Sequence, residues 1–210
     1  LFRSGVLGAL VEVSLKVAPR PRREATTVLA LDESCALDLC LRWRSRPLPV
    51  SATAWVADAS GASGKLSVRL SGNESAVRQG LEEIGGEQLP EEAADAFWLG
   101  LRDQAHAFFR QRPLWRIVLP AGAPALGLGP VLHEWGGCQR WLAGSHDAAA
   151  LRDRVRALGG SACLYRREGA SADVPAFHPL ADGVLQIHRR LKREFDPAGI
   201  FNAHRLYPEL

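Results

Sequence analysis

The sequence has no methionine and only four cysteines among its 210 residues. The cysteines form no CxxC pair and no zinc-ligand spacing, so we expect reduced thiols in a cytosolic protein. No apolar run approaches the ~20 residues that span a bilayer, and no signal peptide opens the sequence. Because a complete protein would contain at least an initiator methionine, we expect this sequence to be a portion of a longer chain.

Metal-ligand spacings are also missing. The six histidines are scattered, and no pair has the HxxxH or HExxH spacing that places two imidazoles on one helix face. We therefore predict no metal site. The glycines of residues 122–129 (GAPALGLG) follow a predicted strand without opening a helix, so this segment reads as a surface loop and not as a cradle for a pyrophosphate.

The net charge of +3 is small, and its positive part is nearly all arginine, scattered along the chain. This distribution does not indicate a nucleic-acid-binding surface. The hydrophobic fraction of 47% is ordinary for a globular protein with a substantial core.

Alternation of apolar and polar residues over 11–17 predicts a half-buried strand, and residues 19–23 (PRPRR) read as a stiff linker. Beyond it the pattern is strand, helix, strand, then strand, helix, with a hairpin signal at 60–64 and Asn73 as the N-cap of the second helix. This is the split arrangement of ferredoxin-like folds. Strands are predicted over 26–31, 52–57, 66–70, 114–119 and 162–165, with two more within 131–142; helices are predicted over 34–45, 91–109 and 147–158 and directly after Asn73. The fold class is thus α+β, a ferredoxin-like antiparallel sheet with helices on one face.

The C-terminal segment carries the strongest motif. Apolar residues recur at helical spacing over 184–195, and Asp196-Pro197 ends that helix because proline disfavours the α region in the residue before it. The run Phe195-Asp-Pro-Ala-Gly-Ile-Phe-Asn-Ala-His-Arg205 resembles the C-terminal signature of FAD-linked oxidases of the vanillyl-alcohol-oxidase type. It departs from that signature at Ala203-His204, where the family has Pro-Gly. Residues 8–17, 46–52, 66–72 and 134–142 extend the resemblance to the FAD-binding subunits of bacterial glycolate oxidases.

This resemblance implies three regions: residues 1–20 as a remnant of an FAD-binding domain with its linker, 21–180 as an α+β cap, and 181–210 as a helix and tail that return to the flavin. It implies FAD as cofactor, with Asn202 near the isoalloxazine and Arg205 as a charge partner. Gly5 and Gly8 resemble the glycines that let the FAD-domain backbone pass close to the cofactor.

The resemblance further implies oxidation of glycolate to glyoxylate, with electrons passing through FAD to an iron-sulfur subunit. The implied partners are that subunit, a second flavin subunit and a small 2-hydroxy acid. The implied location is the cytoplasm, at the inner membrane through partner subunits. D-Lactate stays open as an alternative substrate, and a non-catalytic docking module of the same complex stays open as an alternative function.

Arginine suits a substrate carboxylate because its planar fork binds both oxygens. Candidates for substrate contact are Trp135, Arg140 and Arg116, with Arg69 also considered. Trp135-Gly136-Gly137 reads either as an edge facing the flavin or a small anion, or as a hairpin turn, which we favour. A general base is expected for this chemistry; His133 and His178 are both available, and the sequence selects neither, so the catalytic residue stays unassigned.

Overall fold

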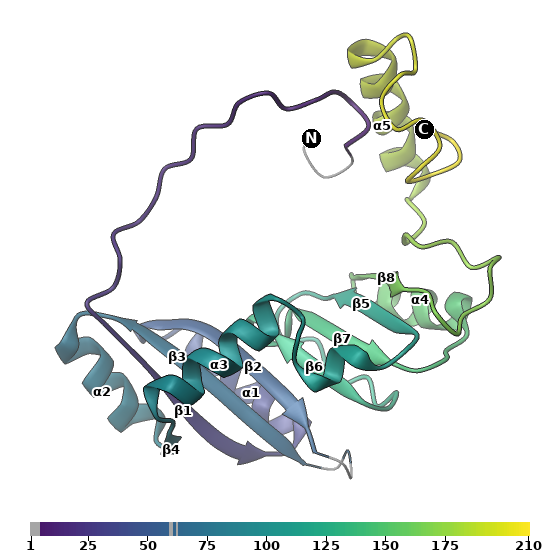
Figure 1. The fold of residues 1–210 in the computed structure, drawn as a ribbon. Coiled ribbons are helices and arrows are strands. Elements are labelled where there is room, and N and C mark those ends of the chain that lie inside the picture. Colours follow the sequence, from purple (N-terminus) through teal and green to yellow (C-terminus); the bar gives the residue numbers. More distant parts are fainter. Residues whose placement is uncertain (1–4, 59–60, 62) are drawn as a thin grey trace. The chain divides into compact units, whose positions relative to one another are not determined.

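The computed structural model describes residues 5–58, 61 and 63–210, and it divides the chain into two compact units. One unit runs from Arg20 to Val174. The other combines the residues up to Pro19 with Pro175–Leu210. Figure 1 labels their helices and strands.

The larger unit contains one sheet of eight strands in the order β4-β1-β3-β2-β6-β7-β5-β8, in which each neighbouring pair is antiparallel. The strands are β1 (Arg23–Leu31), β2 (Val50–Ala57), β3 (Gly64–Gly72), β4 (Glu87–Gln88), β5 (Leu114–Val118), β6 (Val131–Glu134), β7 (Gln139–Ala143) and β8 (Ser161–Arg166). The helices are α1 (Glu33–Trp43), α2 (Glu74–Ile84), α3 (Glu91–Arg102) and α4 (Ala148–Ala157), with 3-10 turns at Ala107–Arg110 and Trp135–Gly137.

The first half confirms the predicted ferredoxin-like pattern. The elements β1-α1-β2-β3-α2-β4 contribute four adjacent strands of this sheet, in the order 4-1-3-2. Asn73 caps α2, because its side chain accepts a hydrogen bond from the Ala76 amide at 2.8 Å. The β2–β3 hairpin is present, but residues 59, 60 and 62 of its predicted turn lie outside the described residues.

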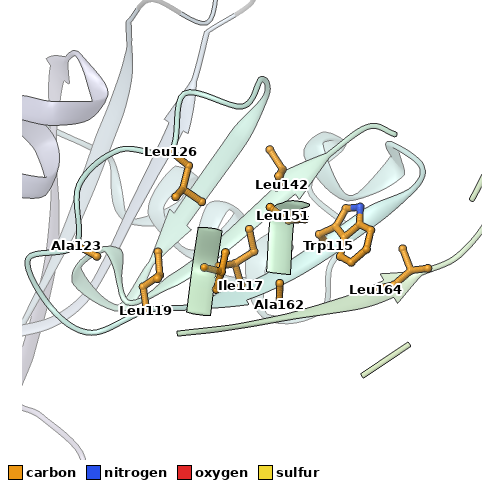
Figure 2. Packing of buried hydrophobic residues seen from close by; sticks show 10 residues of the cluster. Trp115, Ile117, Leu119, Ala123, Leu126, Leu142, Leu151, Ala162 and Leu164 are labelled. Atoms are coloured by element: carbon orange, nitrogen blue, oxygen red, sulfur yellow. The ribbon is translucent and has the colours of Figure 1, made fainter. Parts of the chain in front are cut away.

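Helices cover both faces of the sheet, whereas the sequence predicted them on one. Helices α1 and α2 pack on the face that carries Trp55 and Val68. Helix α4 packs on the same face further along, where Trp115, Ile117 and Leu142 form a core with Leu151 and Val155, seen closely in Figure 2. Helix α3 lies on the opposite face, where Leu101 packs with Ala54, Leu132 and Trp141. Successive residues of a strand point to opposite faces, so both faces of the central strands carry apolar residues.

Two predicted elements differ from the structure. The helix predicted over 91–109 ends at Arg102, because the chain turns through Gln104, whose φ of 54° lies outside the helical region. The strand predicted over 11–17 is irregular, and Val11 is 96% exposed. A strand needs a neighbour for its backbone groups, and no described strand pairs with this segment.

The smaller unit is built around α5 (Asp182–Phe195). Asp196 follows it, and its carboxylate accepts hydrogen bonds from the amides of Ile200 at 3.0 Å and Phe201 at 2.9 Å. Lys192 pairs with the same carboxylate and donates to the carbonyl oxygens of Val6 and Phe201, each at 2.7 Å. This half-buried lysine therefore joins the helix, the tail and the N-terminal segment.

Candidate functional site

A cleft of about 580 Å³ lies on the α3 face of the larger unit, between α3 and strands β2, β3, β6 and β7. Its walls combine aromatic rings with polar and charged groups. The aromatic, polar and charged side chains of these walls include Arg69, Trp98, Glu134, Trp135, Gln139 and Trp141. Clefts of this size that mix apolar walls with a few polar groups are typical of small-molecule sites.

The β6–β7 hairpin supplies one wall of the cleft. Glu134 and Gln139 are opposite one another in register, and strand alternation places them on the same face as Trp141. The turn between them contains Trp135, Gly136 and Gly137, which confirms the favoured hairpin interpretation.

The hairpin turn holds Trp135 at the edge of the cleft. Its backbone is in the left-handed region at φ 55°, and the side chain is 61% exposed. The amide of Gly136 donates to the Thr53 hydroxyl at 2.7 Å, which fastens the turn to β2. A non-glycine residue in this backbone region carries strain that the surrounding contacts have to sustain.

A chain of hydrogen bonds fixes the carboxylate of Glu134. Its Oε2 accepts from Gln139 Nε2 at 2.9 Å and from Trp141 Nε1 at 2.5 Å. The orientation of Gln139 is set in turn by Arg116, whose Nε donates to Gln139 Oε1 at 2.8 Å. Arg116 therefore acts one step behind the cleft wall, and Glu134 is one of the charged groups that line the cleft.

Arg69 supplies a positive group to the same cleft. Its guanidinium carbon lies 5.4 Å from the ring centroid of Trp98, and its Nε donates to the Ser51 hydroxyl at 3.0 Å. Trp98 is itself held by a 2.9 Å hydrogen bond from its Nε1 to Thr26 Oγ1. Arg69 Nε is 3.9 Å from Glu24, and within the part of the chain that the structure describes its two terminal nitrogens make no hydrogen bond.

Arg140 and His133 lie on the other face, away from the cleft. Arg140 is buried and donates to three backbone carbonyls, those of Gly137, Pro124 and Ala123 at 2.5–3.0 Å. Burial lowers its pKa. Arg140 thus supports the loop before β6 and the hairpin turn. Of the three residues predicted to contact substrate, the structure places Trp135 at the cleft, Arg116 behind its wall and Arg140 on the opposite face.

The buried His133 sits opposite Arg140 in register and contacts α1 through Glu33, with His133 Nε2 2.9 Å from Glu33 Oε1. Burial lowers the pKa of His133, against the opposing influence of Glu33. Because His133 and Glu134 are consecutive in β6, their side chains point to opposite faces, and His133 does not reach the cleft. His178 belongs to the smaller unit, where its carbonyl oxygen accepts from the Tyr207 hydroxyl at 3.1 Å.

The smaller unit contains the four residues that the family resemblance associates with FAD, and two of them are in contact while the other two are exposed. Asn202 Nδ2 donates to the carbonyl oxygen of Gly5 at 2.8 Å, so the structure brings these two residues together. Arg205 is exposed, and so is Gly8, beside which a Cβ atom would meet nothing within 4 Å.

A second cavity of about 410 Å³ lies on the other side of Trp135 and is lined by Trp43, Cys40 and Thr53 among others. Burial raises the pKa of the Cys40 thiol to about 11, so this cysteine stays protonated and unreactive at neutral pH.

Sequence reasoning missed Glu134 and the pairing of its side chain with Gln139. Their signal was the pair of polar residues flanking the turn Trp135–Cys138, at positions that a hairpin places directly opposite one another. Among the described residues, no three His, Cys, Asp or Glu side chains gather as metal ligands, and no helix is long and apolar enough to cross a membrane.

No protein-family model matches the chain. A curated relative does: the chain is 36% identical over 208 residues to glycolate oxidase subunit GlcE of Escherichia coli (strain K12). The match covers 98% of this chain and 55% of GlcE, so the chain spans about half the length of that relative. The resemblance to glycolate oxidase subunits is therefore confirmed along nearly the whole of this chain.

Proposed function

We propose that this chain is part of the FAD-binding subunit of a glycolate oxidase that converts glycolate to glyoxylate. The observation that carries the proposal is the 36% identity to GlcE over 98% of the chain. The fold is compatible with it, because an α+β unit with a polar cleft on its sheet is suited to cover a cofactor and exclude water from a small substrate.

In this proposal, three exposed residues of the smaller unit would contact FAD. Gly8 leaves room for a close approach, Arg205 offers an exposed positive charge, and Asn202 retains a carbonyl oxygen after its amide nitrogen has bonded Gly5. Bound FAD would accept the electrons from the substrate. The positive charge of Arg205 would favour the reduced, anionic form of such a cofactor.

The larger unit would supply the substrate wall. Arg69 offers terminal N–H donors, Glu134 offers a positioned carboxylate, and Trp135 forms an apolar edge. D-Lactate remains the competing substrate, since its extra methyl group adds only apolar volume. The proposed partners are a second flavin subunit and an iron-sulfur subunit. The proposed location of the complex is the cytoplasm, at the inner membrane through those partners.

The test uses the full-length polypeptide that contains this chain, purified together with its partner subunits. We expect bound FAD and reduction of an artificial electron acceptor on addition of glycolate. Arg205→Ala should lower FAD retention, whereas Arg190→Ala, an exposed arginine on α5, should not. A complex that holds no FAD, or that reduces the acceptor with D-lactate and not with glycolate, would contradict the proposal.

A second function, a docking module of the same complex, is favoured by the surface of α5. Helix α5 buries none of its residues, and its apolar stripe of Val184, Ile187 and Phe195 is exposed, as is Ile200 beyond it. Such stripes pack against another surface. Ile187→Asp should reduce co-purification with the partner subunits, and Gln186→Asp should not. Equal recovery of partners with both variants would exclude this role.

A further inference from the structure

The α3-face cleft contains one positive and one negative group that are each held in place and each keep a free side. Arg69 is positioned by Ser51 and by the ring of Trp98. Glu134 is positioned by Gln139 and Trp141, both of which bond the same oxygen, Oε2. Within the described residues, Glu134 Oε1 and the terminal nitrogens of Arg69 have no hydrogen-bond partner.

The remaining polar groups of the cleft are less well placed for a ligand. Arg102 pairs with its neighbour Asp103 at 2.8 Å, and Gln104 is bonded to Arg166 and Tyr165. Arg116 lies behind Gln139, with its guanidinium near the ring of Trp141. The exposed Asp95 lies on α3 at the rim, without a hydrogen bond to any residue described.

We infer that this cleft recognises small 2-hydroxy carboxylates, with Arg69 binding the carboxylate and Glu134 accepting a hydrogen bond from the 2-hydroxyl group. Arginine binds both oxygens of a carboxylate, and a charged acceptor is a strong partner for a hydroxyl donor. This inference rests on the proposed function, because the 2-hydroxy acid is its substrate class.

The charge of Glu134 makes the site selective. A carboxylate ligand without a hydroxyl group brings no donor to Glu134 and places its own charge near another anion. The site therefore rejects it, as a site built to bond a hydroxyl rejects an analogue that lacks one. Gln139 and Arg116 are positioning residues in this scheme, because Gln139 orients Glu134 and Arg116 orients Gln139.

The test is a titration of the 210-residue chain with glycolate and with acetate, followed by NMR. We expect glycolate to bind the wild-type chain about tenfold more tightly than acetate. A difference of this size is typical of one hydrogen bond to a charged group. In Glu134→Gln the amide oxygen can keep the bonds to Gln139 and Trp141, which leaves an NH₂ group facing the cleft. The preference for glycolate should fall to near one, and acetate should bind at least as tightly as it binds the wild type, because the neighbouring negative charge has been removed.

Two variants complete the test. Arg69→Gln should weaken both acids together, and Asp95→Asn, which removes a carboxylate from the rim, should leave the preference unchanged. Equal binding of the two acids by the wild type, or an unchanged preference in Glu134→Gln, would overturn the inference. Selective binding by the chain, combined with a full-length complex that does not oxidise glycolate, would instead reject the proposed function and keep the recognition site.

Discussion

The side-chain amide of Asn202 donates a hydrogen bond to the carbonyl oxygen of Gly5 at 2.8 Å, although 197 positions separate the two residues. Together with the bonds of Lys192 to Val6 and Phe201, it holds the N-terminal segment against the C-terminal tail. The two segments that the sequence linked with FAD therefore form one structural unit.

Removal of this bond should loosen the N-terminal segment. Asn202→Ala eliminates the donor at an exposed position, so we expect a loss of about 1 kcal/mol in local stability. Hydrogen exchange of the segment around Gly5 and Val6 should accelerate while exchange in the sheet of the larger unit stays the same. Unchanged exchange near Gly5 would show that Lys192 alone holds the segment.

The tail after α5 should detach in acid. The bond from Lys192 and the amides of Ile200 and Phe201 lower the pKa of Asp196 from 3.8 to about 2. Because the pKa is lower in the folded state, the stabilisation is complete above about pH 4 and is lost as the pH falls through about 2. NMR signals of Ile200 and Phe201 should report this loss. In Asp196→Asn the tail should already be loosened at pH 7. Because the variant lacks the titrating carboxylate, its Ile200 and Phe201 signals should not change further between pH 4 and 2.

Stability of the larger unit should also depend on His133. Burial lowers its pKa below 6.5, so the unfolded chain takes up a proton more readily than the folded chain as the pH falls below 6.5. Stability is then highest above that value and declines below it, by at most about 1.4 kcal/mol per pH unit for one group. Urea unfolding at pH 7.5 and 5.5 measures the difference in the free energy of unfolding. His133→Asn should be less stable at both values and show a smaller difference between them. An equal difference in the variant would assign the pH effect to other groups.

The turn of the β6–β7 hairpin should not tolerate a side chain at Gly137. Its φ is 81°, and a Cβ atom there would lie 2.2 Å from Leu37 Cδ2 of α1. We expect Gly137→Ala to cost about 2–4 kcal/mol, because backbone strain and overpacking add. Gly127→Ala is the matched control: its φ of 61° is similar, but a Cβ atom there meets nothing within 4 Å. It should cost only about 1 kcal/mol. Equal losses in thermal unfolding would show that α1 yields to the added methyl group.

Much of the larger unit follows from local signals. Asn73 caps the helix predicted directly after it, and Asp147, the first residue of the helix predicted over 147–158, caps α4. Both side chains accept a hydrogen bond from the amide three residues on. The Gly136-Gly137 pair marks a true hairpin. The sequence did not indicate that α3 lies on the opposite face, because the order of strands in the sheet depends on contacts distant in sequence.

The candidate site was harder to predict for the same reason. Arg140 and Arg116 are both arginines in strands, yet one supports backbone carbonyls on the α1 face and the other orients Gln139 on the α3 face. The register of β5 against β7 places them on opposite faces, because Arg116 lies opposite Trp141 and Arg140 lies opposite Ile117. The alternation over Val11–Val17 also has the form of a strand, and a sequence pattern cannot show whether a neighbouring strand is available.

His133 and Glu134 are consecutive in β6, so their side chains lie on opposite faces of the sheet and can be substituted separately. Substitutions at Glu134, Gln139 and Arg69 change the cleft without touching the contacts of Glu33, His133 and Arg140 beneath it. The ligand preference proposed for the cleft and the stability of the sheet that carries it can therefore change independently, so new preferences could arise in small steps while the fold stays intact.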